Sequence, residues 1–290
     1  MHPDQRVHVL DGFSLEMTAR DVPGLDEAAT LLPIGTRVNI TYLAGETAAQ
    51  RVDAARVVRV HGFTPVPHVA ARRMHSPAEL AEFLAALRQS GATDELFVVG
   101  GDPATPAGPF ADSLAVLRSG LLQEAGVRRV AVAGYPEGHP DIPGPTLDAA
   151  LRAKVAVLTE QGLEPAVITQ FGFDVHPVLD WIVALRRQGI TAPVRVVVPG
   201  PVGIRRLLAY ARRFGVATSA GVTRKYGFSL ANLLGTAGPD AFVTALDDGL
   251  DPGVHGDVRT HFYTFGGLPA TSAWVRGFAA HPGRAVDGRR

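Results

Sequence analysis

The chain reads Arg129-Val130-Ala131-Val132-Ala133-Gly134-Tyr135-Pro136-Glu137-Gly138-His139-Pro140 near its centre, and this stretch decides the fold. An apolar run typical of a buried strand ends in an aromatic ring, a carboxylate and an imidazole. Residues 168–174, Ile-Thr-Gln-Phe-Gly-Phe-Asp, close the next apolar run in the same way. In parallel α/β proteins, ligands and reacting groups collect at the carboxyl ends of the strands. Two such strand ends in one chain therefore indicate an enzyme.

On both sides of this stretch, short β-rich runs alternate with helical patterns. A helix is expected after Ser76, where a serine N-cap precedes proline at the first helical position, and it ends at Gly91. Similar helical patterns occupy residues 177–187 and 203–214, and residues 224–250 are expected to add helices before the last strand. Strands are expected at residues 12–17, 37–42, 64–69, 96–99, 129–133, 166–169, 194–198 and 261–265.

Eight strand–helix units predict an α/β fold with a single (β/α)8 barrel over residues 1–281 and a disordered tail over residues 282–290. A doubly wound open sheet is the alternative. No Gly-x-Gly-x-x-Gly motif follows the first strand, which weakens a nucleotide-binding open sheet.

The composition excludes several classes of function. The 290 residues carry 28 basic and 28 acidic side chains, so no basic surface for nucleic acid or anionic lipid is expected. The absence of cysteine excludes disulfides, thiolate catalysis and zinc–thiolate sites. The amino-terminal residues 1–6 lack the long apolar core of a signal peptide, and no apolar run approaches membrane-spanning length, so a soluble cytoplasmic protein is expected. The sequence does not indicate an oligomeric state.

Two carboxylates at strand ends are candidate catalytic groups. Glu16 lies in a predicted central strand, where burying a carboxylate without a partner costs free energy. It either acts in catalysis, pairs with an arginine or caps a loop. Asp102 follows two glycines and precedes a proline, so it is either a turn residue or a second catalytic carboxylate. If the two converge, each raises the pKa of the other, which would keep a general acid protonated near neutral pH.

The histidines and the glutamine have less distinctive settings. His68 and His139 are either ordinary loop or core histidines or groups that face a ligand, and no spacing matches a metal-ligand signature, so no metal is predicted. Gln170 offers a donor and an acceptor to the amide edge of a heterocycle, or else it stabilises a turn. Phe171 and Phe173 are more typical of packing than of stacking on a ligand.

Taken in order, these strand ends resemble the methylenetetrahydrofolate reductases over nearly the whole chain. The blocks at residues 133–140 and 168–171 are the more specific part of the resemblance. The residues that carry it are Ser14-Leu15-Glu16, Asn39-Ile40-Thr41-Tyr42, Pro67-His68, Gly101-Asp102-Pro103, residues 133–140, 168–171 and 173–174, Pro199-Gly200-Pro201-Val202 and His261-Phe262-Tyr263-Thr264.

The resemblance implies a (β/α)8 barrel that reduces 5,10-methylenetetrahydrofolate to 5-methyltetrahydrofolate. It makes Glu16 the general acid that protonates N10, and it places Asp102 near the pterin. Gln170, with Phe171 beside it, would bind the folate. The positions that line the flavin cofactor in usual members are Thr41, His68, Ala133, Tyr135 and His139.

The departures from the family pattern concern the flavin. Gly100 stands where the family usually has an arginine. The helix after the fifth strand has Leu147, Ala150 and Ala153 at an Asp, an Asn and an Arg position and keeps only Lys154. Each lost charge-assisted hydrogen bond is worth about 1.5–3 kcal/mol. The sequence therefore predicts that FAD is absent and that NADH, or alternatively NADPH, passes a hydride directly to the iminium carbon of the folate.

Three alternatives remain open: an FAD enzyme with a rebuilt cofactor site, a reductase with a deazaflavin donor, and a non-catalytic folate-binding subunit. The arginine that usually meets the glutamate tail of the folate is also replaced, within residues 265–267. Arg224, Lys225 or Arg276 are the candidates to substitute for it.

Overall fold

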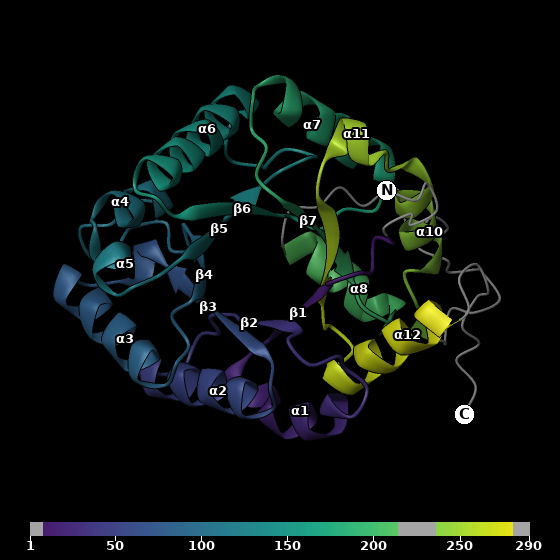
Figure 1. Cartoon of the computed structure of the whole chain (residues 1–290), viewed down its shortest axis with the longest axis horizontal. Coiled ribbons are helices and arrows are strands. Elements are labelled where there is room, and N and C mark those ends of the chain that lie inside the picture. Colours follow the sequence, from purple (N-terminus) through teal and green to yellow (C-terminus); the bar gives the residue numbers. More distant parts are fainter. Residues whose placement is uncertain (1–7, 214–235, 281–290) are drawn as a thin grey trace, which may run out of the picture.

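A closed barrel of eight parallel strands forms the centre of the molecule (Figure 1). The computed structural model describes residues 8–213 and 236–280. Around the barrel the strand order is β1-β10-β7-β6-β5-β4-β3-β2. The strands are β1 (Ser14–Met17), β2 (Arg37–Ile40), β3 (Thr64–Ala70), β4 (Glu95–Val99), β5 (Arg129–Gly134), β6 (Glu164–Thr169), β7 (Val194–Pro199) and β10 (Val258–Tyr263). The predicted (β/α)8 barrel is confirmed, and the open-sheet alternative is wrong.

Helices lie around the strands, all on the outside of the barrel except α8, which lies inside this ring and packs Leu207 against the apolar cluster of the barrel interior (Figure 1). They are α1 (Val22–Ala29), α2 (Ala48–Val60), α3 (Pro77–Gln89), α4 (Ser113–Arg118), α5 (Leu121–Glu124), α6 (Gly144–Glu160), α7 (Val175–Arg187), α8 (Ile204–Arg213), α10 (Asp240–Gly249), α11 (Pro252–His255) and α12 (Leu268–Ala280). Two 3-10 helices, η1 (Ala19–Asp21) and η2 (Ala71–Arg73), follow β1 and β3.

The segment before the last strand holds more than the expected helices. Helix α10 lies within the stretch where helices were predicted, and α11 follows just beyond its end. A short antiparallel pair, β8 (Val202–Gly203) with β9 (Thr236–Ala237), was not predicted. Residues 224–235 of the predicted insertion and the predicted tail at 282–290 lie outside the described residues.

Local hydrogen bonds explain where elements begin and end. The hydroxyl of Ser76 accepts from the backbone N–H of Glu79 at 3.1 Å, so α3 starts where the sequence predicts. Helix α7 starts at Val175 rather than residue 177, because the carboxylate of Asp174 accepts from the backbone N–H of His176 and caps the helix earlier. Strand β10 spans residues 258–263 rather than 261–265, since residues 263–267 form turns.

Side chains alternate between the two faces of each strand. Leu15, Met17, Val38 and Ile40 point outward into the large core between the barrel and its helices. A smaller apolar cluster fills the interior of the barrel, with Val66, Phe97, Ala131, Ala166, Ile168 and Val197 among its members. Polar residues on the inward face of a strand therefore lie above or below this apolar plug.

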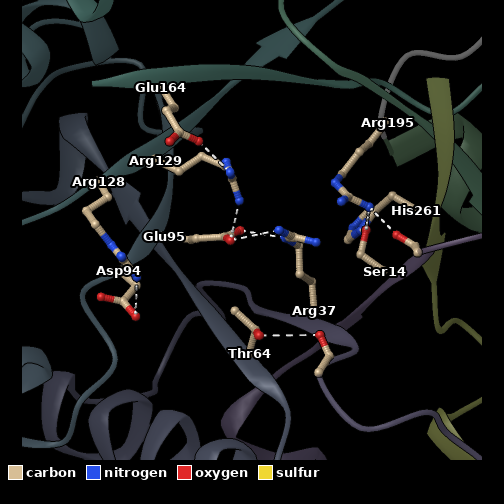
Figure 2. A network of polar contacts seen from close by, with 12 residues as sticks. Ser14, Arg37, Thr64, Asp94, Glu95, Arg128, Arg129, Glu164, Arg195 and His261 are labelled. Carbon is tan, nitrogen blue, oxygen red and sulfur yellow. Dashed lines mark hydrogen bonds and ion pairs between the residues drawn. The ribbon is translucent and has the colours of Figure 1, made fainter. Parts of the chain in front are cut away.

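Charged residues fill the amino-terminal end of the barrel (Figure 2). Arg37 donates to both carboxylate oxygens of Glu95 at 2.7 and 2.9 Å, and Arg129 links Glu95 to Glu164. Burial works to raise the pKa of Glu95, but the hydrogen bonds from Arg37 and the charges of Arg129 and Arg195 outweigh it and lower that pKa. These acidic and basic side chains form ion pairs with one another at the end of the barrel opposite the strand C-termini.

Candidate active site

Glu16 stands near the carboxyl end of β1 and faces the barrel interior. It lies in register with Asn39 of β2 and Tyr263 of β10, so neighbouring strands flank it on both sides. The hydroxyl of Thr264 donates to its backbone carbonyl at 2.6 Å and fixes the strand there. Only 17% of its side chain is exposed. The carboxylate is thus held at the top of the apolar plug, at the end of the barrel where the loops after the strands meet.

Two buried histidines flank this carboxylate. Glu16 Oε2 lies 3.8 Å from His68 Nε2 and 3.7 Å from His261 Nε2. Burial lowers the pKa of His68 to about 4, although the carboxylate of Glu16 acts against that shift. Burial, assisted by the charge of Arg195, lowers the pKa of His261 to about 3. Both imidazoles are therefore neutral near pH 7.

Burial also sets the acidity of Glu16 and raises its pKa to about 7. The positive charge that His68 would carry if it were protonated acts in the opposite direction, and the nearby carboxylate of Asp21 adds to the increase. The expectation that Asp102 raises this pKa is wrong, because Asp102 faces Arg73 instead. A carboxyl group with a pKa near the working pH is suited to general acid catalysis.

Each histidine is held by a second polar group. Ser14 Oγ lies 2.8 Å from His261 Nδ1, and Arg195 Nη1 donates to Ser14 Oγ at 3.3 Å (Figure 2). Asn39 Nδ2 lies 3.3 Å from His68 Nε2. His261, Ser14 and Asn39 were not predicted as site residues. The available signal was strand alternation, which puts His261 and Tyr263 on one face of residues 258–263.

Asp102 occupies a separate position on the rim of the barrel. Its Oδ1 accepts from Arg73 Nε at 2.9 Å and from Nη2 at 2.5 Å, and 72% of its side chain is exposed. The guanidinium of Arg73 also lies 4.4 Å above the ring of Tyr42. Asp102 is thus an exposed carboxylate held by an arginine that the sequence analysis missed, although Arg72-Arg73 follow directly on β3.

A cavity of about 520 Å³ opens between the loops that follow β5 and β6. Its lining includes residues 136–144, Gln170 and Phe171. Gln170 Oε1 accepts from the backbone N–H of Phe171 at 2.9 Å, so the glutamine does stabilise its own turn. Phe171 is 2% exposed and packs edge-on against Tyr263 and Phe265, which indicates a wall of the cavity rather than an open stacking surface. Glu16 does not line this cavity.

The remaining predicted residues lie at the ends of β2 and β5. Thr41 is partly exposed directly after β2, and its N–H bonds to the carbonyl of Met17. The rings of Tyr135 and His139 meet edge to face with centroids 5.4 Å apart. Ala133 and Tyr135 line a second cavity of about 190 Å³.

Apart from Thr41, the predicted residues therefore fall into three groups. Glu16 and His68 come together inside the barrel mouth, and Asp102 lies apart beside Arg73. Around the two cavities lie Ala133, Tyr135, His139, Gln170 and Phe171. Of the candidates for the glutamate tail, Arg276 is exposed on α12, and Arg224 and Lys225 lie outside the described residues.

Among residues 8–213 and 236–280, no group of three or more His, Asp or Glu side chains is arranged to hold a metal ion. Within the same ranges, no helix is both long enough and apolar enough to cross a membrane.

Comparisons with known proteins agree with this architecture. Over 94% of its length, the chain superposes on a putative phosphonomutase from Burkholderia cenocepacia J2315, with a TM-score of 0.52, 12% sequence identity and 93% of that chain covered. It also superposes on the dihydropteroate synthase FolP from Thermus thermophilus, with a TM-score of 0.50, 14% identity and 96% of each chain covered. At these identities the likeness concerns the fold alone. A sequence model of methylenetetrahydrofolate reductase, however, matches residues 22–217, and by that match the chain belongs to the methylenetetrahydrofolate reductase family.

Proposed function

We propose that this protein reduces 5,10-methylenetetrahydrofolate to 5-methyltetrahydrofolate by direct hydride transfer from NADH, without a bound flavin. The family supplies the general activity, a reduction of methylenetetrahydrofolate. The hydride donor, the acid and the absence of flavin are the parts proposed here. Both substrates are then bound at once, because no cofactor stores the hydride between them.

The observation that carries the proposal is the setting of Glu16. Opening the five-membered ring of the folate needs a proton at N10, and the iminium that results is the hydride acceptor. Glu16 lies at the barrel mouth with a pKa near 7, so a large fraction is protonated at neutral pH. We assign the proton transfer to this group. Asp102, Gln170 and Phe171 are proposed to contact the folate, and Thr41, His68, Ala133, Tyr135 and His139 to line the nicotinamide side.

The region beside β5 supports the absence of flavin. The 190 Å³ cavity there is lined by Leu147, Asp148 and Trp181 together with residues of the β5 loop, and no arginine or lysine contributes to its lining. Along α6, Arg152 is bonded to Gln188, and burial lowers the pKa of Lys154. A cofactor diphosphate needs cations or several N–H donors. The described part of α6 offers little of either toward this cavity.

The test is a spectrum and an assay on the same purified protein. We expect no stoichiometric flavin absorption and an oxidation of NADH that depends on methylenetetrahydrofolate and does not increase when FAD is added. A yellow protein with one flavin per chain contradicts the flavin-free route. Activity only with a reduced deazaflavin favours that donor instead. Tight folate binding with no turnover under any donor indicates a folate-binding subunit.

A further inference from the structure

One oxygen of the Glu16 carboxylate lies midway between two imidazole nitrogens. The distances from Oε2 to Nε2 of His261 and of His68 are 3.7 and 3.8 Å. Both exceed ordinary hydrogen-bond length, and a displacement of about 1 Å toward either ring makes that bond. The two rings come from β10 and β3, on opposite sides of β1. What each nitrogen presents to Glu16 is decided by its second partner.

His261 presents a hydrogen. The guanidinium of Arg195 can only donate, so Ser14 Oγ accepts from it at 3.3 Å. The hydroxyl hydrogen of Ser14 is then free to go to Nδ1 of His261 at 2.8 Å. A neutral ring that accepts at Nδ1 carries its hydrogen on Nε2. Among the described residues, this buried Nε2 has no hydrogen-bond partner, and Glu16 is the carboxylate that it faces.

His68 presents a lone pair. The amide nitrogen of Asn39 lies 3.3 Å from its Nε2, and an amide N–H can only donate. The ring therefore accepts at Nε2 and carries its hydrogen on Nδ1. Its edge-to-face contact with Phe97, at 4.7 Å between centroids, holds the ring plane in place. This single lone pair, held only weakly by the amide at 3.3 Å, is shared with the hydrogen of Glu16 when that carboxyl group, 3.8 Å away, is protonated, and it repels the carboxylate when Glu16 is ionised.

We propose that His68 and His261 are positioning residues that serve the two protonation states of Glu16, His68 accepting the hydrogen of the carboxylic acid and His261 donating to the carboxylate. In the proposed reaction, on which the catalytic part of this inference rests, the hydrogen of Glu16 leaves its bond to His68 and turns to N10, and the O–H bond breaks as the N10–H bond forms. The electron pair stays on Oε2, which then turns from His68 to His261. The carboxyl group has a fixed partner before and after the transfer and does not need water to stabilise either form.

Other charged and titratable groups among the described residues also interact with the pair. Tyr263 and Asp21 are the remaining titratable groups that interact with Glu16. Arg51 acts on His68, and Arg195 acts on His261. Because both arginines hold a positive charge, they help to keep the two rings neutral and so preserve the opposite polarities.

The experiment is an infrared titration of the Glu16 carboxyl group in the ligand-free protein, with the spectrum of Glu16→Gln subtracted. It compares His68→Phe with His261→Phe, which add the same apolar ring on opposite sides. We expect the pKa of Glu16 in His68→Phe to lie below that in His261→Phe by about one to two units. His255→Phe, which replaces a buried histidine on α11, is the matched control and should leave this pKa unchanged. Equal shifts in the two variants, or the reverse order, overturn the proposal.

Nitrogen NMR of the wild-type histidines provides a second measurement if either variant fails to fold. His68 should be protonated at Nδ1 and His261 at Nε2, and the same tautomer in both rings contradicts the proposal. Neither measurement needs turnover. A failure of the proposed folate reduction can therefore be distinguished from a failure of the proposed roles of the two histidines. If the pKa order holds and no reductase activity is found, the proposed function fails while the pairing of the two histidines stands. If both hold, the pH profile of kcat/KM should shift in the two variants in the same order.

Discussion

At the scale of single residues, the site is governed by the cost of burying charge. Near pH 7, His68 and His261 are neutral and Glu16 is protonated in a large fraction of molecules. Burial penalises the ionised form of each group. A carboxyl group in such a setting releases a proton only when something compensates for the new charge. The N–H of His261 provides that compensation within a short movement of the side chain. The carboxyl group of Glu16 can therefore release one proton from Oε2, the oxygen that lies near both histidines.

Replacing Glu16 with glutamine should remove this proton while retaining the shape of the side chain. We expect kcat for methylenetetrahydrofolate reduction to fall by a factor of about 10²–10⁴, the usual contribution of a general acid. The dissociation constant for folate should change little. Steady-state kinetics and a binding titration measure the two effects. Glu160→Gln, at an exposed position near the end of α6, is the control. Unchanged turnover in Glu16→Gln removes Glu16 from the mechanism.

The raised pKa of Glu16 also predicts how stability depends on pH. The folded state binds the proton more tightly than the unfolded state, because the pKa is about 7 when folded and 4.5 in the reference state. The contribution of this group to the free energy of unfolding therefore falls as pH rises from about 4.5 to 7. Relative to wild type, Glu16→Gln should gain about 2–3 kcal/mol between about pH 4.5 and 8, at about 1.36 kcal/mol per unit. Denaturant unfolding of both proteins at several pH values measures this difference. A constant difference contradicts the burial of a neutral acid.

At the scale of elements, the end of β5 depends on a residue without a side chain. A Cβ atom on Gly134 would lie 2.5 Å from Cη2 of Trp181 and 2.8 Å from Cγ1 of Val167. Trp181 belongs to α7 and Val167 to β6, so glycine allows the helix to close on the strand directly below Tyr135. The close packing fixes where the β5 loop leaves the barrel.

Gly134→Ala should therefore destabilise the protein by about 1–3 kcal/mol, the usual cost of overpacking. Because the strain falls on α7, Gly134→Ala combined with Trp181→Phe should recover part of the loss. Thermal unfolding of the single and double variants measures both effects. Gly144→Ala is the control, since nothing lies within 4 Å of a Cβ atom at that glycine. A double variant no more stable than Gly134→Ala shows that the tryptophan is not what the methyl group meets.

The elements themselves were predictable from sequence, because apolar runs and caps are local properties. Ser76 indicated the start of α3 correctly, while Asp174 was not recognised as the cap of α7. The surroundings of Glu16 were less accessible. Its position on β1 could be inferred, but its contact with His261 depends on β1 lying beside β10 across the closure of the barrel. Likewise, Asp102 was expected beside Glu16, and the arginine that it faces instead lies on another loop.

At the scale of the whole molecule, the two ends of the barrel differ in the charge of the polar side chains in the barrel interior. The carboxyl end holds neutral titratable groups beneath its loops, whereas the amino end holds a network of matched ions (Figure 2). The network joins β2, β4, β5 and β6 through Arg37, Glu95, Arg129 and Glu164. Glu95 is its centre, since it bonds to both arginines and only 13% of its side chain is exposed.

Glu95→Ala should leave Arg37, Arg129 and Arg195 facing one another without their shared carboxylate. Removing one partner of a buried ion pair costs about 3–5 kcal/mol, and the partial exposure of Arg37 and Arg129 lowers this to about 2–4 kcal/mol. Glu164→Ala is the control, because its side chain is 64% exposed and its loss should cost less than about 1 kcal/mol. Urea unfolding gives both values. Turnover per folded molecule should stay near wild type in both variants, since Arg195, which reaches the site through Ser14, is held by the Gly12 carbonyl and the Ser14 hydroxyl rather than by a hydrogen bond to Glu95. A large fall in kcat for Glu95→Ala at full folding contradicts this separation and indicates that charge at the amino end controls the acid at the other.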